Sequence, residues 1–288
     1  EELDYMPNEV ARSLLKKRSN LIGVIVPYLD HPFFSRLTEA IENACYCNGY
    51  KMLLCTSGNN HDKEREMVSM LRANKVDGIL LCSRIEDASI YAEYELPMIS
   101  IERTVENIPS VCCDNYMGGV LAAQTLIKGG CKHPLLFGNT VVEYMPAKLR
   151  HLGFHDECKR QGVESYEFLL DREDLFAENF HRNLDKLIRK FPDVDGIFAT
   201  SDVLAVRALK SLQDRGRSAP DDFQIVGFDG IDTSDYFNIT TIAQPIKQMG
   251  EFSVEMLIKR INGKMIPNQS ILPVTLLSRR TTKNPNIR

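Results

Sequence analysis

A carboxylate and an amide stand at the ends of two consecutive apolar stretches and could together bind a polar ligand. The apolar run 225–228 ends at Asp229, and the run 241–243 ends at Gln244. In a parallel α/β sheet, ligands bind beyond the carboxyl ends of the strands. Asp229 would accept hydrogen bonds there, and Gln244 can both donate and accept them. The alternative is that Asp229 caps a turn and Gln244 is a solvated strand end.

Alternating strands and helices are predicted along most of the chain, and this order would bring such side chains to one edge of a sheet. Short apolar runs are typical of buried parallel strands, and apolar residues at helical spacing indicate the helices between them. The predicted strands are 21–27, 50–55, 78–82, 98–101, 110–113, 134–137, 166–170, 196–200, 224–228, 241–244 and 272–278. The predicted helices are one that opens at 30–34 and then 61–74, 120–127, 147–160, 176–190, 201–212 and 246–262.

This alternation indicates an α/β fold of two similar doubly wound lobes, each with a mostly parallel sheet, and with a ligand cleft between them. The strands are too many for one sheet of the usual size. The chain would cross between the lobes near Gly129–Lys132, Ala243–Pro245 and Ile271. The expected divisions are 1–19 for an N-terminal hinge region, 20–130 with 244–271 for the first lobe, and 131–243 with 272–284 for the second.

Composition limits the kinds of partner that the body of the protein can have. The chain has 288 residues, with 35 Lys and Arg against 39 Asp and Glu. A slightly acidic body argues against nucleic-acid binding by charge alone, so any basic patch must be local. The hydrophobic content of 43% is typical of a soluble globular protein, and no apolar run approaches the length of a membrane span.

The eight cysteines are expected to be reduced thiols of a cytoplasmic protein. Five of them lie in or beside apolar strands, where a thiol behaves as a small hydrophobic group. No two have CxxC spacing, and no Cys and His residues have the spacing of zinc ligands. The five in or beside strands are Cys55, Cys82, Cys112, Cys113 and Cys131, and the others are Cys45, Cys47 and Cys158.

The sequence offers little support for an enzyme. His151 and His155 are four residues apart on a predicted helix, a spacing that can hold a metal ion, but no Glu completes an HExxH arrangement. We expect them to be surface or core histidines. The chain has no GxGxxG or Walker-type loop and no Ser/His/Asp or Cys/His set. We therefore expect no enzymatic activity, no cofactor and no metal.

Residues 7–18 are predicted to form a short helix that begins at Pro7 or Asn8 and ends in the basic run Lys16-Lys17-Arg18. A helix of two or three turns is marginal in water, so this one would need a partner to fold. The alternative is an ordinary N-terminal arm on the body.

The sequence resembles the lac repressor family of bacterial transcription regulators along essentially the whole chain. Residues 7–27 are similar to the hinge helix and first core strand of such repressors, and residues 96–103 to a strand that ends in an acid–Arg pair. The third marker is Val226-Gly227-Phe228-Asp229-Gly230 with the segment 240–245. The cores of these regulators are similar to periplasmic sugar-binding proteins of the ribose type. The resemblance implies that a helix-turn-helix lies just upstream of residue 1.

The resemblance implies that aromatic, charged and amide side chains bind a sugar, through stacking and charge-assisted hydrogen bonds. His31 and Ser201 stand where Asn is common in the family pattern, and Glu102 stands where Asp is found. Phe34 also has helical core spacing and could be simply buried, and Arg103 could pair with Glu102. The implied effector-binding residues are His31, Phe33, Phe34, Glu102, Arg103, Arg150, Ser201, Asp202, Asp229 and Gln244.

The resemblance further implies a homodimer that represses a sugar-utilisation operon of the ribose or sucrose type by binding a palindromic operator, without a membrane partner. Leu14 has the position of the family's apolar wedge in the DNA minor groove. A purine effector is a less favoured option. The alternative from another class is a solute-binding protein of a sugar transporter, which the hinge stretch and the cysteines disfavour. The implied DNA-binding residues of the hinge are Asn8, Arg12, Ser13, Leu14 and Lys16.

Overall fold

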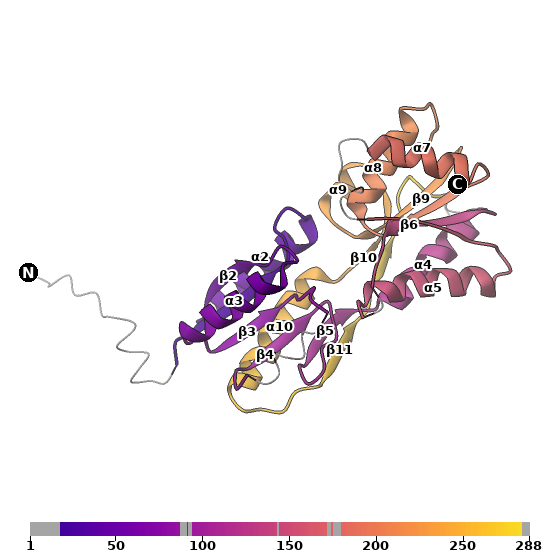
Figure 1. Cartoon of the computed structure of the whole chain (residues 1–288). Helices are drawn as coiled ribbons and strands as arrows, with labels where there is room; N and C mark the ends of the chain where they lie inside the picture. Colours follow the sequence, from indigo (N-terminus) through magenta and orange to yellow (C-terminus); the bar gives the residue numbers. More distant parts are fainter. Residues whose placement is uncertain are drawn as a thin grey trace, which may run out of the picture. The chain divides into compact units, whose positions relative to one another are not determined.

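The chain folds into two compact units and passes between them three times. Unit 1 comprises Glu1–Cys112 and Ile246–Ile271, and unit 2 comprises Cys113–Pro245 and Leu272–Arg288. Figure 1 follows the chain through both. The computed structural model describes residues 18–86, 91, 94–142, 144–171, 174 and 180–283. The predicted hinge helix, with Asn8, Arg12, Ser13, Leu14 and Lys16, lies outside the described residues.

The sheet of unit 1 has the strand order β11-β5-β4-β3-β1-β2. The pairs β2/β1, β1/β3, β3/β4 and β4/β5 are parallel, as the near-continuous apolar runs predicted. Strand β2 is at the edge and is partly exposed, whereas every residue of β3 and β4 is buried. The strands are β1 (Leu21–Val26), β2 (Lys51–Thr56), β3 (Gly78–Leu81), β4 (Met98–Ile101), β5 (Ser110–Cys113) and β11 (Gln269–Leu272).

Helices cover both faces of the unit 1 sheet. A Cβ atom on Gly23 would lie 2.6 Å from the side chain of Leu71 in α3, and one on Gly78 would lie 2.8 Å from Leu257 in α10. Gly23 pairs with Ile79, the residue after Gly78. Because successive strand residues point to opposite faces, α3 and α10 lie on opposite sides of the sheet. The helices are α2 (Pro32–Cys47), α3 (His61–Ala73) and α10 (Ile246–Ile261). Helix α2 packs beside α10.

Unit 2 repeats this architecture with the strand order β12-β10-β9-β8-β6-β7. Its sheet is parallel except for β12, which pairs antiparallel with β10. The prediction of two similar doubly wound α/β lobes is thus confirmed. The strands are β6 (Pro134–Asn139), β7 (Tyr166–Leu170), β8 (Gly196–Ala199), β9 (Gln224–Asp229), β10 (Thr240–Ala243) and β12 (Thr275–Leu277).

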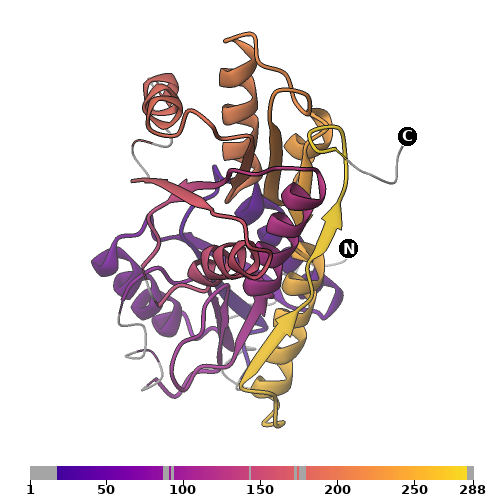
Figure 2. The same cartoon turned by 90° about the vertical axis from the view of Figure 1, so that its right-hand side faces the viewer.

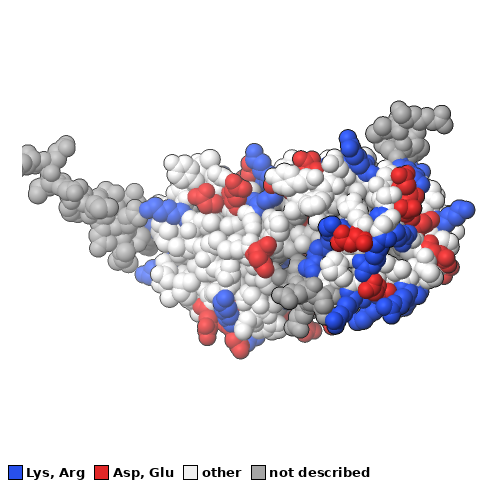
Figure 3. Space-filling model, turned by 90° about the horizontal axis from the view of Figure 1, so that it is seen from above, with Lys and Arg blue, Asp and Glu red and all other residues white. Residues whose placement is uncertain are grey.

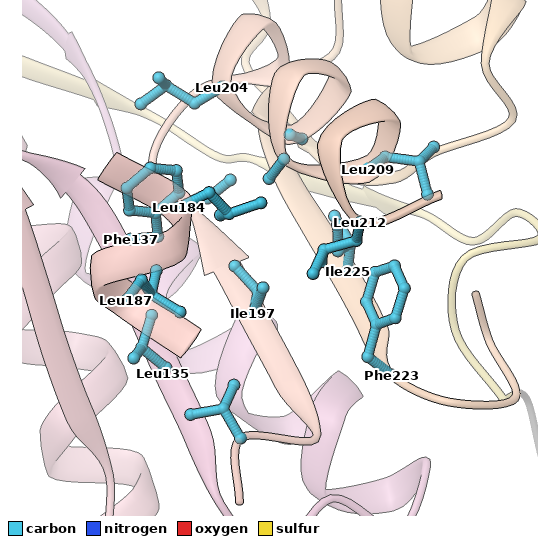
Figure 4. Packing of buried hydrophobic residues seen from close by; sticks show 14 of the residues in the cluster. Leu135, Phe137, Leu184, Leu187, Ile197, Leu204, Leu209, Leu212, Phe223 and Ile225 are labelled. Carbon is cyan, nitrogen blue, oxygen red and sulfur yellow. The ribbon is translucent and has the colours of Figure 1, made fainter. Parts of the chain in front are cut away.

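One face of the unit 2 sheet is covered by α7 and α8, and the other by α4. Phe137 and Ile197 of the sheet pack with Leu184 and Leu187 of α7 and Leu212 of α8 in one buried cluster, which Figure 4 shows. The strongly amphipathic pattern of α7 supplies its buried leucines at helical spacing. The helices are α4 (Asn115–Lys128), α5 (Ala147–Arg160), α7 (Phe180–Lys190), α8 (Asp202–Gln213) and the short α9 (Asp232–Tyr236), which was not predicted.

The first crossing between the units lies at Cys112–Cys113, whereas the sequence placed it at Gly129–Lys132. The difference arises because α4 packs against α5 of unit 2, and a Cβ atom on Gly119 would lie only 2.0 Å from the carbonyl oxygen of Arg150. The single predicted strand 272–278 was also wrong. Two strands separated by Pro273-Val274 form here instead, β11 in the sheet of unit 1 and β12 in the sheet of unit 2, as the yellow segment of Figure 2 shows.

Charges of both signs are interspersed over the face of unit 2 that Figure 3 shows. Ion pairs of this unit include Arg215 with Asp185 at 2.5 Å and Lys210 with Asp214 at 2.6 Å. Such a mixed face lacks the extended basic character that attracts a nucleic-acid backbone. In the described part of the chain, none of the helices has both the length and the apolar character needed to span a membrane.

Candidate functional site

In each unit the strand order reverses around the first strand, as β2-β1-β3 in unit 1 and β7-β6-β8 in unit 2. In doubly wound sheets, ligands bind beyond the carboxyl ends of the strands at such a reversal. Six of the ten predicted effector-binding residues lie at a strand end or within three residues beyond one. His31, Phe33 and Phe34 lie farther beyond β1, around the start of α2, and Arg150 projects from α5.

The start of α2, just after β1, holds the aromatic part of the predicted set. His31 is the N-cap of the helix, and its Nδ1 accepts a hydrogen bond from the backbone N–H of Phe33 at 3.3 Å. Pro32 follows at the first helical position, where its missing N–H costs nothing. The rings of Phe33 and Phe34 meet edge to face at 5.1 Å and are 3% and 5% exposed. The helix start therefore fixes all three rings.

An acidic and two basic side chains lie just beyond the ends of β3 and β4, and one of them, Arg84, lies over the Phe34 ring. Arg84 places its guanidinium carbon 5.5 Å from the centre of the Phe34 ring and its Nη2 4.0 Å from Oε2 of Glu102. Arg103 instead donates hydrogen bonds to the carbonyl oxygens of Ile85 and Glu86. Arg84 was not predicted, although its place three residues after the buried strand β3 could have indicated it.

The guanidinium of Arg150 in unit 2 is held on three sides. Its Nε and Nη2 donate to Oδ1 of Asn115 at 2.9 and 2.6 Å, and Nη1 donates to the carbonyl oxygen of Thr200 at 2.9 Å. Its carbon lies 3.7 Å from the centre of the Phe228 ring. Each of these partners is uncharged, so the positive charge is oriented but not neutralised by them. Asn115 and Thr200 were missed by the sequence analysis, although both lie just beyond strand ends.

Asp229 and Gln244, the two residues that the sequence placed at neighbouring strand ends, are in direct contact. Nε2 of Gln244 donates to Oδ1 of Asp229 at 2.8 Å, and its backbone N–H donates to the Asp229 carbonyl oxygen at 3.0 Å. Oε1 of Gln244 is buried and has no hydrogen-bond partner among the described residues. A buried acceptor of this kind needs a donor, which a ligand hydroxyl could supply.

Ser201 and Asp202 have structural contacts at the start of α8. Ser201 is the N-cap, and its hydroxyl accepts from the N–H of Leu204 at 3.3 Å. Asp202 is fully buried, and its carboxylate accepts from the Thr241 hydroxyl and from the N–H of Ile231. Burial raises the pKa of Asp202 to about 6, although these hydrogen bonds oppose the shift.

Two acidic residues of the predicted set have backbone conformations that side-chain-bearing residues rarely adopt. Glu102, just after β4, has φ of +64°, and Asp229, at the end of β9, has φ of +117°. Such conformations cost about 1–3 kcal/mol each and persist where surrounding structure enforces them, often at ligand sites. Each unit thus carries one strained acidic residue at the carboxyl end of its sheet.

Comparison with known proteins identifies the family. Residues 19–280 match the family described as periplasmic binding proteins and sugar binding domain of the LacI family. The chain belongs to the LacI family. It is 37% identical over 281 residues to the sucrose operon repressor of Streptococcus mutans, covering 96% of this chain and 85% of that protein.

Two further LacI-family relatives agree with this assignment. The ribose operon repressor of Halalkalibacterium halodurans is 35% identical over 286 residues, covering 98% of this chain and 85% of the relative. A periplasmic binding protein/LacI transcriptional regulator from Alkaliphilus metalliredigens, solved in complex with D-xylulofuranose, is 32% identical with a TM-score of 0.79. That comparison covers 91% of this chain and 99% of the other.

Six of the eight cysteines of the LacI-family core are buried, whereas Cys55 is partly exposed and Cys47 is exposed. None of the eight forms a disulfide, and burial raises the pKa of Cys45, Cys112 and Cys131 to about 12. A protonated thiol is a poor nucleophile and metal ligand. Among the described residues, no group of three His, Cys, Asp or Glu side chains is arranged to hold a metal ion.

The histidines of α5 both contact Glu167 of β7. Nδ1 of the buried His151 lies 3.2 Å from Oε1 of Glu167, and Nε2 of the partly exposed His155 lies 3.6 Å from the same oxygen. Burial lowers the pKa of His151 to about 4, although Glu167 opposes the shift. His151 is therefore a neutral core histidine above that pH, as the sequence analysis allowed.

His151 should make the fold less stable as the solution becomes acidic. The unfolded chain takes up the His151 proton near pH 6.5, whereas the folded chain does so only near pH 4. Between these values the unfolded state binds more protons, so the free energy of unfolding rises with pH, by up to about 3 kcal/mol from this group. Urea unfolding at pH 4–7 should show a smaller rise for His151→Gln than for the parent. His155→Gln is the control, and an identical rise in the parent and His151→Gln would contradict the assignment.

Proposed function

We propose that this chain is the effector-binding core of a sugar-responsive transcriptional repressor that acts on a sugar-utilisation operon of the ribose or sucrose type. The observation that carries the proposal is the oriented guanidinium of Arg150 over Phe228, together with the hydrogen bond between Gln244 and Asp229, the residue that follows Phe228. This arrangement offers charge-assisted donors, a carboxylate acceptor and an amide to hydroxyl groups. The relatives named as sucrose and ribose operon repressors support the same class.

The effector contacts that we propose fall into two groups. In unit 1, Phe33 and Phe34 supply ring faces, and His31, Glu102 and Arg103 supply polar groups. In unit 2, Arg150, Ser201, Asp229 and Gln244 supply the polar groups. Sugars present both apolar ring faces and many hydroxyls, so this mixture of aromatic and charged side chains suits them better than it suits a purely apolar ligand.

A thermal-shift panel of pentoses, hexoses, disaccharides, sugar phosphates and purines tests this proposal. A ligand that binds only the folded state at a hundredfold excess over its dissociation constant stabilises by about 2.7 kcal/mol. We expect at least one sugar, with D-ribose and sucrose tested first, to raise the melting temperature, and hypoxanthine and guanine to leave it unchanged. Stabilisation by the purines alone, or by no member of the panel, would overturn the proposal.

A solute-binding protein of a transporter is the alternative, because such proteins share the fold. The eight cysteines, none of which forms a disulfide, argue against it, because an oxidising compartment would expose them to disulfide formation. We infer that the protein acts on DNA in the cytoplasm and is not an enzyme.

We propose that the repressor is a homodimer whose interface includes β2 and α3 of unit 1. The edge strand β2 and helix α3 expose Leu54 and Met70, which are 38% and 42% exposed, and Tyr46 near the end of α2 is 79% exposed. Burial of such apolar side chains against a second copy would be favourable.

The double variant Leu54→Lys/Met70→Lys should therefore sediment as a monomer at micromolar concentration, where the parent sediments as a dimer. Placing unpaired charges in an apolar interface costs several kcal/mol. Met265→Lys is the matched control, since Met265 is fully exposed on a loop of the same unit. A monomeric parent, or a double variant that remains dimeric, would argue against this interface.

We further propose that Asn8, Arg12, Ser13, Leu14 and Lys16 form a hinge that folds on the operator. With the helix-turn-helix joined to the chain, Leu14→Ala should reduce both DNA bending and operator affinity, because wedge side chains between base steps produce the kink. The control is Leu15→Ala, and gel-shift bending assays measure both quantities. Equal bending and affinity in Leu14→Ala and the parent would exclude the wedge.

A further inference from the structure

The carboxylate of Asp202 connects three segments of unit 2. Asp202 is 0% exposed at the first position of α8. Its Oδ1 accepts a hydrogen bond from the Thr241 hydroxyl of β10 at 2.6 Å, and its Oδ2 accepts from the backbone N–H of Ile231 at 2.9 Å. Ile231 is the N-cap of α9, in the turn that follows Asp229. One side chain therefore ties α8 to β10 and to the turn beyond β9.

Strand β9 leaves space for this carboxylate. Gly227 lies two residues before Asp229, and a Cβ atom on Gly227 would be 2.3 Å from Oδ1 of Asp202. No side chain larger than hydrogen fits there without displacing the carboxylate. The sequence Gly-Phe-Asp-Gly thus serves two purposes. Gly227 leaves room for the carboxylate of Asp202, and Asp229 belongs to the candidate site.

The segments that Asp202 joins are those that carry Asp229 and Gln244. Ile231 follows Asp229 by two residues, and Thr241 precedes Gln244 by three. Asp229 has a φ of +117°, a conformation that needs support from neighbouring groups. The hydrogen bond to the Ile231 N–H fixes the exit of this turn, and the one to Thr241 fixes the strand that ends at Gln244. The Asp229–Gln244 hydrogen bond, at 2.8 Å, joins the ends of these two segments.

We propose that Asp202 is a positioning residue, which holds Asp229 and Gln244 in the geometry that binds the effector and does not itself contact the effector. This replaces the direct contact that the family pattern implied for Asp202. The effector part of the inference rests on the proposed function, whereas the positioning part does not. Burying a carboxylate is costly and raises its pKa to about 6, so a site that needed only stability would favour an apolar side chain.

Variants of Thr241 separate positioning from direct contact, because they alter the support of Asp202 and leave its carboxylate in place. Thr241→Val removes the hydroxyl at nearly constant shape, and Thr241→Ser restores it. Thr240→Val is the matched control, since Thr240 is equally buried on the same strand but bonds to Thr282 and Arg279 instead. Asp202→Asn completes the set, because it replaces one of the two accepting oxygens with an NH2 group that can only donate.

The first measurement is backbone hydrogen exchange of the peptide that spans 229–236 in the unliganded chain, followed by mass spectrometry. We expect Asp202→Asn and Thr241→Val to accelerate exchange at Ile231 at least about tenfold, because the first changes the acceptor of the Ile231 N–H and the second removes the hydroxyl that holds this acceptor in place. Thr241→Ser and Thr240→Val should exchange there as the parent does. Unchanged exchange in both Thr241→Val and Asp202→Asn would overturn the inference.

The second measurement is calorimetric titration with D-ribose and with sucrose at a temperature where every variant is folded. We expect Thr241→Val to bind the sugar at least about tenfold more weakly than the parent and Thr241→Ser to recover affinity to within about threefold. Parent-like affinity in Thr241→Val together with lost binding in Asp202→Asn would make Asp202 a direct contact and overturn the inference. If neither sugar binds the parent, the proposed specificity fails, and the exchange measurement alone decides the positioning role.

Discussion

Replacing Arg150 with alanine is expected to weaken effector binding about 100-fold or more, which corresponds to about 3 kcal/mol. Arg150 is 6% exposed, and its guanidinium is aligned by Asn115, Thr200 and Phe228. Hydrogen bonds from a charged donor contribute about 1.5–3 kcal/mol each, and an oriented donor loses little entropy when it binds. Calorimetric titration with the sugar that gives the largest thermal shift measures the effect.

Two further variants identify the source of the loss. Arg150→Lys keeps the charge but cannot reproduce the planar fork that reaches both Asn115 and Thr200, so it should bind at least about tenfold more weakly than the parent. Arg160→Ala is the control on the same helix, because Arg160 is largely exposed and pairs with Glu157. Full affinity in Arg150→Ala would remove this residue from the site and, with it, the main support for the proposed function.

The sequence predicted the parallel strands well because a buried parallel strand needs a short apolar run, whereas the partly exposed strands β11 and β12 lack such a run and were predicted as one strand. It located α4 and the first crossing poorly. Gly118-Gly119 lowers helix propensity, so the helix was predicted to begin at Val120, whereas it begins at Asn115. The glycines are present because α5 and Phe228 come too close for side chains, and such tertiary contacts are not visible in a local pattern.

For the candidate site, too, the local sequence pattern predicted some of the residues but not their contacts. Strand ends followed by polar residues indicated Asp229 and Gln244, which the structure joins by a hydrogen bond. The environment of each residue could not be predicted in this way. Asp202 matches the family pattern as well as Asp229 does. Only the fold shows that Thr241 and Ile231 donate hydrogen bonds to the Asp202 carboxylate. Asn115, which aligns Arg150, was missed because its role depends on the packing of α4 against α5.

Gly119→Ala is expected to lower the free energy of unfolding by about 3 kcal/mol or more. By helix propensity alone, alanine in place of glycine would stabilise α4 by about 1 kcal/mol. The new Cβ atom would however lie 2.0 Å from the carbonyl oxygen of Arg150 and 2.7 Å from the N–H nitrogen of Phe154. Backbone atoms of a packed helix cannot yield as a flexible side chain does, so α4 and α5 would have to separate.

A lower free energy of unfolding would show that close helix packing dominates, and a higher one that helix propensity dominates. Urea unfolding of the parent and the variant measures this free energy. Met117→Ala is the control, since Met117 is 43% exposed on the same helix and its loss should change stability by about 0.5 kcal/mol or less. Because the obstructing oxygen belongs to Arg150, Gly119→Ala should also weaken sugar binding in the fraction that remains folded. A variant as stable as the parent would show that the two helices do not approach as closely as the structure places them.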